Sequence, residues 1–254
     1  MKKFLYPLLF VGLAFLASCG GDDPLPSPVV SFITDPGVVE VGVPVKFENQ
    51  SLKASSYLWD FGGGVTSEEI SPTVTFDSRG ELYVKLTANT DDGQMVTDSL
   101  LISVKERVLT GYFVNIYPTT NGTAAWDPTE DGEAQFADIL IQLIADQATN
   151  TENSLIDGIF TDVGLSSFSL TVDPAFDKVT FTNEVWVFSM FDFDGADGET
   201  PSQTNTEFMA LAPFNPLEAP TFKNDEGDAG YFSVFFQDDD TGFVIDLDFT
   251  FVIE

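Results

Sequence analysis

The chain of 254 residues has no histidine and only one cysteine, Cys19. Without histidine, neither a Ser-His-Asp triad nor a Cys-His pair can form, and a catalytic zinc site would lack its usual ligands. A single cysteine also excludes a disulfide within the chain. Most side-chain machinery for catalysis is therefore missing, and we predict that this protein is not an enzyme.

Basic residues are also scarce: 10 Lys and Arg stand against 41 Asp and Glu, which gives a formal net charge of −31. Nucleic-acid binding needs a basic surface and is excluded, and docking of the body onto anionic lipid is disfavoured. The imbalance is greatest in residues 109–254, which hold only Lys178 and Lys223 against 27 acids. Such self-repulsion destabilises a compact domain unless bound cations or solvation offset it.

One kind of catalysis needs no histidine. A glycoside hydrolase uses two carboxylates, about 5 Å or about 6.5–9.5 Å apart, and a chain with 41 acids has room for such a pair. No motif marks one. A surface glycoside hydrolase, or an accessory protein of polysaccharide breakdown, is therefore the alternative to a non-catalytic module.

The amino end carries Lys2 and Lys3, followed by an apolar run over residues 4–17. A transmembrane helix needs about 20 apolar residues, so this run is typical of a secretory signal peptide. Residues 16–20 read Leu-Ala-Ser-Cys-Gly and resemble the lipobox of bacterial lipoproteins. The resemblance implies cleavage before Cys19 and diacylglycerol on its sulfur. An ordinary signal peptide with an incidental cysteine is the alternative, and the position of the only cysteine favours the lipobox.

Residues 19–28 form a tether rich in Gly and Pro, which cannot build a core. Asp22 and Asp23, just after the acylated cysteine, resemble the surface-export signal of some Gram-negative lipoproteins. These resemblances imply an outer-membrane lipoprotein of a Gram-negative bacterium that faces the cell surface. Several acyl chains would hold it firmly, since each buried methylene contributes about 0.8 kcal/mol.

Strand signals recur along the rest of the chain. Short apolar or alternating segments appear about every 8–12 residues, separated by Gly, Pro, Asn and Asp, which is typical of sandwiches and barrels. The clearest segments are 45–47, 83–87, 100–104, 138–144, 185–191, 231–236 and 243–253. Residues 139–147 come nearest to a helix, but their Ile and Leu suit a buried strand equally well. We predict an all-β fold of two β-sandwich domains, residues 29–107 and residues 109–254.

The first of these domains contains three motifs. Residues 57–64 read Tyr-Leu-Trp-Asp-Phe-Gly-Gly-Gly, residues 71–76 read Ser-Pro-Thr-Val-Thr-Phe, and residues 80–89 begin Gly-Glu-Leu-Tyr-Val. They resemble the polycystic kidney disease (PKD) repeat, an immunoglobulin-like sandwich of bacterial surface proteins. The resemblance implies a spacer, or a contact for proteins or glycans. We expect Trp59 to fill the space between two sheets and the glycines to form a turn with positive φ.

Acidic residues of the second domain gather in three loops, within residues 126–138, 190–199 and 237–242. Ca²⁺ takes about six to eight hard oxygen ligands, which flexible loops of Asp supply. The arrangement resembles the calcium-dependent lipid-binding sandwich domains first named in protein kinase C. That resemblance implies ligands at Asp127, Asp138, Asp192, Asp194 and Glu207, and two further acids of the same loops complete the candidate set, Asp131 and Asp197.

Two alternatives to this calcium site stand beside it. The loop from Asp127 to Asp138 loosely matches an EF-hand, but an Asp replaces the bidentate Glu and no helices flank it, so we reject that fold. Solvated turns are the other alternative, because Asp and Gly are ordinary turn formers. The charge of the domain and its two family-like loops support calcium.

Exposed aromatic rings can stack on sugars. Tyr112, Tyr117, Trp126 and Trp186 are candidates, with Trp126 and Tyr117 as the binding residues, and burial in a core is the other outcome. We predict a non-catalytic binding or structural module, in which the PKD-like domain lifts an acidic, calcium-stabilised sandwich off the membrane to meet a glycan or a surface protein. A component that assembles through its sheet edges would have the same sequence features.

Overall fold

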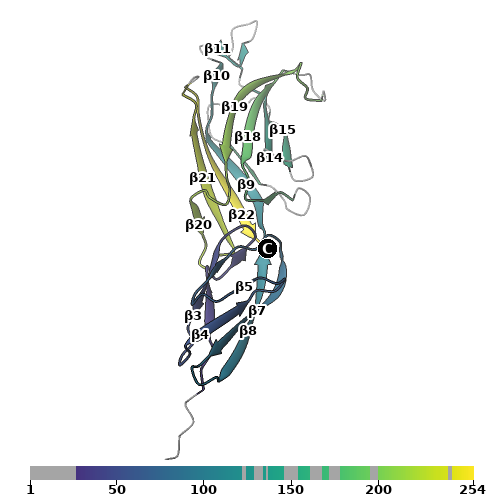
Figure 1. The fold of residues 1–254 in the computed structure, drawn as a ribbon. Coiled ribbons are helices and arrows are strands. Elements are labelled where there is room, and N and C mark those ends of the chain that lie inside the picture. Colours follow the sequence, from purple (N-terminus) through teal and green to yellow (C-terminus); the bar gives the residue numbers. More distant parts are fainter. Residues whose placement is uncertain are drawn as a thin grey trace, which may run out of the picture.

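The computed structural model describes residues 27–121, 124–128, 134–135, 137–145, 154–160, 168–171, 178–194, 200–239 and 242–254. Two antiparallel-rich sandwiches lie end to end (Figure 1), so the all-β fold predicted from the sequence is confirmed. Each expected strand segment corresponds to a strand. The predicted signal peptide and Cys19 lie outside the described residues, and no helix within the described part is long and apolar enough to cross a membrane.

The first domain encloses one core between two sheets. Its strands are β1 (Phe32–Asp35), β2 (Val39–Glu40), β3 (Val45–Asn49), β4 (Ser56–Asp60), β5 (Thr66–Ser67), β6 (Thr73–Val74), β7 (Gly80–Asn89) and β8 (Met95–Lys105). One sheet has the order β1-β3-β6 and the other β2-β8-β7-β4-β5. Among these strand pairs, β2 and β8 are parallel and the others are antiparallel.

Trp59 lies at the centre of this core, with no exposed surface. Its ring stacks on Phe61 at a centroid distance of 5.9 Å, and its indole N–H donates to the carbonyl of Glu69 at 2.9 Å. Gly62, Gly63 and Gly64 all have positive φ, at 77°, 59° and 87°. A side chain is disfavoured in that conformation, so the predicted roles of the tryptophan and the glycine turn are confirmed.

The second domain is a larger sandwich with sheets of six and four strands. Its main strands are β9 (Arg107–Ile116), β14 (Ile139–Ala145), β15 (Ser154–Phe160), β16 (Phe168–Thr171), β17 (Thr180–Phe181), β18 (Trp186–Phe193), β19 (Thr206–Phe214), β20 (Thr221–Lys223), β21 (Ala229–Gln237) and β22 (Val244–Ile253). The six-stranded sheet follows the order β16-β9-β22-β21-β20, with β17 also paired to β9, and the four-stranded sheet follows β15-β14-β18-β19. Two short hairpins precede β14: β10 (Thr120–Asn121) with β11 (Ala124–Ala125), and β12 (Asp127–Pro128) with β13 (Ala134–Gln135).

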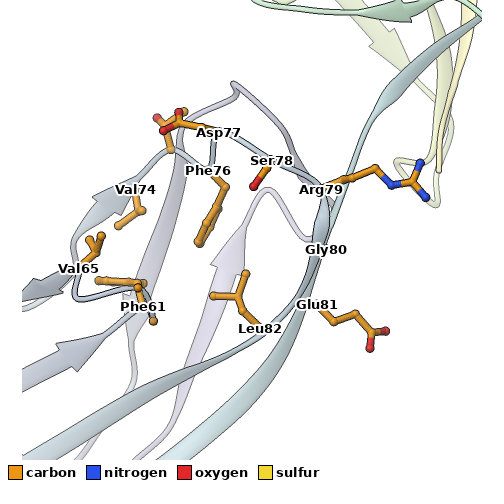
Figure 2. Close-up of a pocket in the computed structure, with 13 residues that line it drawn as sticks. Phe61, Val65, Val74, Phe76, Asp77, Ser78, Arg79, Gly80, Glu81 and Leu82 are labelled. Atoms are coloured by element: carbon orange, nitrogen blue, oxygen red, sulfur yellow. The ribbon is translucent and has the colours of Figure 1, made fainter.

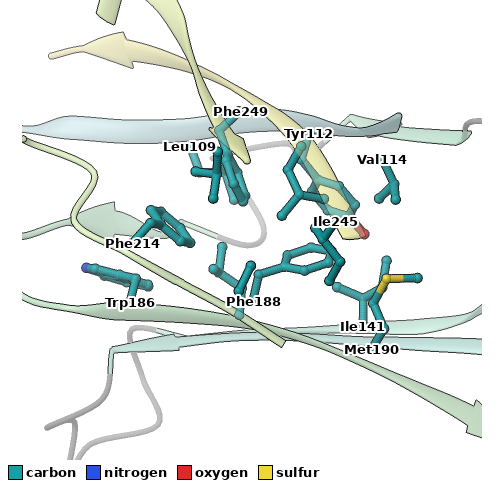
Figure 3. Packing of buried hydrophobic residues seen from close by; sticks show 14 of the residues in the cluster. Leu109, Tyr112, Val114, Ile141, Trp186, Phe188, Met190, Phe214, Ile245 and Phe249 are labelled. Atoms are coloured by element: carbon teal, nitrogen blue, oxygen red, sulfur yellow. The ribbon is translucent and has the colours of Figure 1, made fainter. Parts of the chain in front are cut away.

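Aromatic side chains from both sheets fill the space between them (Figure 3). Phe249 of β22 lies at their centre, stacked on Phe214 at 4.9 Å and on Phe232 at 5.2 Å. Tyr112 and Trp186, two of the aromatic candidates for sugar stacking, are fully buried in the same cluster. Alternate residues of each strand face opposite sides of its sheet, so only every second residue reaches this core.

A buried ionic contact joins the two domains. Glu106 alone separates β8 from β9, and it exchanges two backbone hydrogen bonds of 3.0 Å with Glu254; the C-terminus accordingly lies at the junction in Figure 1. Arg107, predicted as the last residue of the first domain, instead begins β9 of the second and bonds Glu40 of β2 at 2.9 Å. The two side chains are 3% and 1% exposed. Lys223 also contacts Glu40. These charges are therefore paired across the boundary between the two domains.

A carboxylate cluster at the distal end of the second domain

The described ends of the three acidic loops lie at one end of the second domain, opposite the junction, which we call the distal end. Asp192 lies opposite both Ile139 and Glu207, which brings the ends of β14, β18 and β19 together. Ile116 lies opposite Asp246, which brings the β21–β22 turn to the same end. Successive antiparallel strands reverse direction, so alternate loops share an end.

Asp192, Asp194 and Glu207 form a cluster at the distal end, with carboxylate oxygens within 4.8 Å of one another. The three side chains converge because Asp192 and Glu207 are directly opposite on paired strands, and Asp194 follows two residues later on the same side. Asp192 has no exposed surface, whereas the other two are open to solvent. The arrangement thus combines one buried carboxylate with two accessible ones.

Backbone contacts fix the position of this cluster. The N–H of Asp138 donates to Asp192 Oδ1 at 3.2 Å, and the carbonyl of Asp138 accepts from the N–H of Phe193 at 2.8 Å. The Asp194 N–H donates to the carbonyl of Asn205 at 3.0 Å. Asn205 is itself buried and accepts a hydrogen bond from the Ser202 N–H at 2.6 Å. Asp194 and Asp192 are therefore held by neighbouring strands and by an ordered turn.

The basic side chains of the second domain lie at the other end. Lys178 pairs with Glu254 at 3.0 Å, and Lys223 contacts Glu40, both at the junction. No further lysine or arginine occurs in residues 109–254. Neighbouring carboxylates repel each other, and a buried one also loses solvation. A bound cation relieves both effects, so the three side chains can hold a metal ion through oxygen ligands.

The structure brings together three of the predicted ligands, Asp192, Asp194 and Glu207. Asp138 joins them through its backbone. Asp127 belongs to β12, where its side chain is not described, and Asp131 and Asp197 lie outside the described residues. The contribution of those three acids to the cluster stays a prediction.

The two predicted binding aromatics pack into the domain. Tyr117 is 8% exposed and makes an edge contact with Phe168 at 5.7 Å, and burial raises the pKa of its phenol. Trp126 is half-buried against the core, and its indole N–H donates to the carbonyl of Pro118 at 3.0 Å. The ring of Tyr117 is thus a core side chain, which corrects its prediction as a surface for sugars.

The cluster does not have the geometry of the carboxylate pair that a glycoside hydrolase requires. Asp192 is completely buried, so its carboxylate cannot touch a sugar ring. Asp194 and Glu207 project from the end of adjacent strands of one sheet. Two catalytic carboxylates must instead flank the scissile bond from opposite sides.

A hollow of about 500 Å³ lies in the first domain, between the glycine turn and the start of β7. Figure 2 shows apolar side chains facing it, among them Phe61, Phe76 and Leu82, whereas Arg79 and Glu81 point away. Arg79 instead pairs with Glu106 at 3.2 Å. Binding sites usually add a few convergent polar groups to such a lining, and the charged residues around this hollow do not converge on it.

Comparison with known proteins agrees with the fold of the first domain. Residues 30–104 match the family described as the PKD domain. The first domain is a PKD domain. The resemblance predicted from its motifs is therefore confirmed, and neither this family match nor the described part of the second domain gives evidence of a catalytic domain.

Relatives of this PKD domain occur within much larger proteins. Collagenase ColQ1 of Bacillus cereus (strain Q1) is 32% identical over 114 residues, which are 43% of this chain and 11% of that protein. The pre-pro-metalloprotease PrtV of Vibrio cholerae serotype O1 (strain M66-2) is 30% identical over 102 residues, which are 38% of this chain and 11% of that protein. Because the chain spans so small a part of these curated relatives, the likeness concerns the PKD region and not their proteolysis.

Solved structures give a similar result. The PKD1 domain of Vibrio anguillarum Epp is 30% identical, with a TM-score of 0.28, and covers 31% of this chain and 94% of its own. The PKD1 domain of Vibrio cholerae PrtV is 36% identical, with a TM-score of 0.28, and covers 31% of this chain and 98% of its own. A carbohydrate-binding module of the β-sandwich superfamily aligns over 89% of this chain and 92% of its own, at 11% identity and a TM-score of 0.30. A likeness at that score carries no argument about a ligand.

Proposed function

We propose that this protein is a non-catalytic binding module, in which the PKD domain carries an acidic, calcium-stabilised sandwich toward a glycan or a surface protein. The observation that supports it best is the cluster of Asp192, Asp194 and Glu207 at the distal end, whose oxygens lie within 4.8 Å of one another while the basic side chains of the domain lie at the junction. The buried ion pair between Arg107 and Glu40, which joins the domains end to end, supports a role in presenting that end at a distance.

Calcium is the cation that suits this cluster. Its ligands are oxygens only, and Ca²⁺ accepts carboxylates, backbone carbonyls and waters in flexible geometry. Zinc and other soft metals favour Cys and His, of which the chain has one and none. Mg²⁺ demands a nearly ideal octahedron and keeps several waters. Two solvent-exposed carboxylates beside a buried one would allow waters to complete a calcium shell.

Calcium is expected to raise the melting temperature of the full chain. A ligand that binds only the folded state, at about 100 times its Kd, contributes about 2.7 kcal/mol. For a domain of this size that corresponds to a rise of about 5–10 °C. The measurement is thermal unfolding by circular dichroism, with millimolar CaCl₂ and with a chelator.

A matched pair of variants locates this effect. The double variant Asp194→Asn with Glu207→Gln removes two exposed charges from the cluster, so it should fold and lose the response to calcium. Glu226→Gln removes an exposed charge from the β20–β21 turn, at the junction end, and should keep the response. Equal melting temperatures of the unmodified chain with calcium and with chelator would remove calcium from the proposal.

The same proposal includes anchoring through Cys19 to the outer membrane, with the module facing the cell surface. Its support is the sequence resemblance to a lipobox, followed by an acidic tether. An alkyne fatty acid fed to Gram-negative cells expressing the full chain is expected to label the protein, and Cys19→Ser is expected to abolish the labelling. Equal labelling of both forms would contradict lipidation at Cys19, and protease treatment of intact cells would show whether the body faces outward.

A further inference from the structure

The outer face of the six-stranded sheet carries large exposed rings. Phe222, Tyr231 and Phe235 of β20 and β21 are 57%, 43% and 65% exposed, and Phe113 of β9 is 46% exposed. A sheet with one face in water usually places polar residues at such outward positions. Phe232 and Val234, which point inward between these rings on β21, are part of the core, so the outward rings add nothing to the packing between the sheets.

Contacts between the strands hold two of these rings in one orientation. Phe222 and Tyr231 are directly opposite, and their rings stack at a centroid distance of 5.0 Å and an interplanar angle of 17°. Gly230 permits this close pairing, since a Cβ at that position would lie 2.1 Å from the carbonyl oxygen of Phe222. The two rings therefore hold each other in one orientation, and binding to the face and edges that each leaves open costs little side-chain entropy.

Polar groups lie between the rings on the same face. Asp248 of β22 is opposite Phe113, and its carboxylate accepts hydrogen bonds from Ser233 on one side and from Asn115, at 2.9 Å, on the other. Asp246 is opposite both Phe235 and Ile116. The face thus alternates aromatic rings with fixed carboxylate, amide and hydroxyl groups across β21, β22 and β9.

Alternation of this kind suits a sugar chain. The C–H groups of a pyranose carry partial positive charge and stack on the negative faces of aromatic rings, while its hydroxyls can donate to carboxylates and accept from amides and hydroxyls. Tyr231 and Phe235 are four residues apart on one strand, which is about 13 Å. A span of that length fits several sugars in a row better than a single one.

Charge decides which sugar chain fits. The face carries Asp246 and Asp248, and the two lysines of residues 109–254 pair with acids at the junction. The uronate or sulfate groups of an anionic polysaccharide would lie against these carboxylates, with no basic side chain of the described residues nearby to attract them. Nucleic acid and anionic lipid are repelled in the same way. We propose that this outer face binds a neutral polysaccharide along β21, with Tyr231 and Phe235 as its main contacts. The proposal rests on the proposed function and gives it a ligand class and a second surface, separate from the carboxylate cluster.

Affinity electrophoresis of the full chain tests the proposal. The native gels contain a neutral polysaccharide (a β-glucan, a galactomannan, an arabinoxylan or glycogen) or an anionic one (alginate or polygalacturonate). At least one neutral polymer should retard the protein, and neither anionic polymer should. Tyr231→Ala and Phe235→Ala should each weaken binding by roughly tenfold, which is the expected loss of one stacked ring.

A matched control comes from the opposite sheet. Phe208 is 49% exposed on the outer face of the four-stranded sheet, where it makes an edge contact with Phe191 at 6.0 Å. Phe208→Ala should leave the retardation unchanged. The melting temperatures of the three variants are compared in the same buffer, once with calcium and once with chelator. If the variants melt at the same temperature in each buffer, a loss of binding is not a loss of folding.

Several outcomes would overturn the inference. Retardation by no neutral polymer, or by anionic polymers alone, would exclude the ligand class. If a neutral polymer still retards the protein when both Tyr231 and Phe235 are replaced by alanine, glycan binding lies elsewhere on the molecule. The proposed function would not be contradicted by that result. A dimer that Tyr231→Ala dissociates in size-exclusion chromatography would show that a second copy covers the face. The calcium melts are independent of all these results, so failure of the calcium site is recognised separately.

Discussion

Replacing Glu40 with alanine is expected to lower the free energy of unfolding by about 3–5 kcal/mol, the cost of removing one partner from a buried ion pair. The Arg107 side chain is only 3% exposed, and Glu40 Oε2 accepts from its Nε at 3.0 Å and lies 2.9 Å from its other guanidinium nitrogen. Without Glu40, the Arg107 guanidinium would still contact the carbonyl of Pro216, at 2.6 Å, and the ring of Phe251, at 4.4 Å. It would have lost the carboxylate that neutralises it. Lys223 would lose its partner as well.

The measurement for Glu40→Ala is equilibrium unfolding in urea, followed by circular dichroism. Glu48→Ala is the control, because Glu48 forms a solvent-exposed pair with Lys46 at 2.8 Å, and such pairs contribute about 0–1 kcal/mol. Loss of the Glu40 carboxylate should also loosen the contact between the domains, so limited proteolysis should cut the Glu40→Ala variant near residues 105–107 sooner than the unmodified chain. Equal stabilities of the Glu40→Ala and Glu48→Ala variants would contradict a buried junction.

Replacing Phe249 with alanine is expected to destabilise the second domain by about 3–5 kcal/mol, as large-to-small changes of buried rings do. Phe249 has no exposed surface and stacks on Phe214 and Phe232 at 4.9 Å and 5.2 Å, with Phe188 edge-on at 6.0 Å. Removing its ring opens a cavity between the two sheets that the neighbouring rings cannot fill without leaving their own contacts.

The control for Phe249→Ala is Phe235→Ala, a change of the same size at a ring that is 65% exposed. Exposed positions away from structural features usually change stability by about 0.5 kcal/mol or less. Urea unfolding of both variants should therefore separate a core ring from a surface ring on neighbouring strands. A similar loss for the two would mean that the outer face is packed against something in solution.

The strand pattern and the PKD motifs were predictable from the sequence because they depend on local order. Alternation of apolar residues indicates strands whatever their partners are. Trp59 and the three glycines lie within one six-residue segment, and a run of glycines next to a strand indicates a tight turn. The three acidic loops were visible for the same reason, since loop residues are contiguous.

Which side of a strand is buried was not visible. In β21, Tyr231 and Phe235 alternate with Phe232 and Val234, so both faces are apolar and the period of two cannot decide between them. The structure buries Phe232 and Val234 and leaves the other two exposed. Tyr117 was predicted to be exposed and is buried. The residues next to it in the sequence do not indicate its contact with Phe168, which comes from a different strand.

The sequence by itself determined the all-β class, the PKD domain and the acidic character of the second domain, because these follow from composition and from residues near one another in the chain. The tertiary structure decided that Asp192 is buried beside Asp194 and Glu207, and that Glu40 meets Arg107 and Lys223 across the junction. The latter contacts join residues 67 and 183 positions apart. Only strand register and domain packing bring such residues together, and both are set by the balance of many weak contacts over the whole chain.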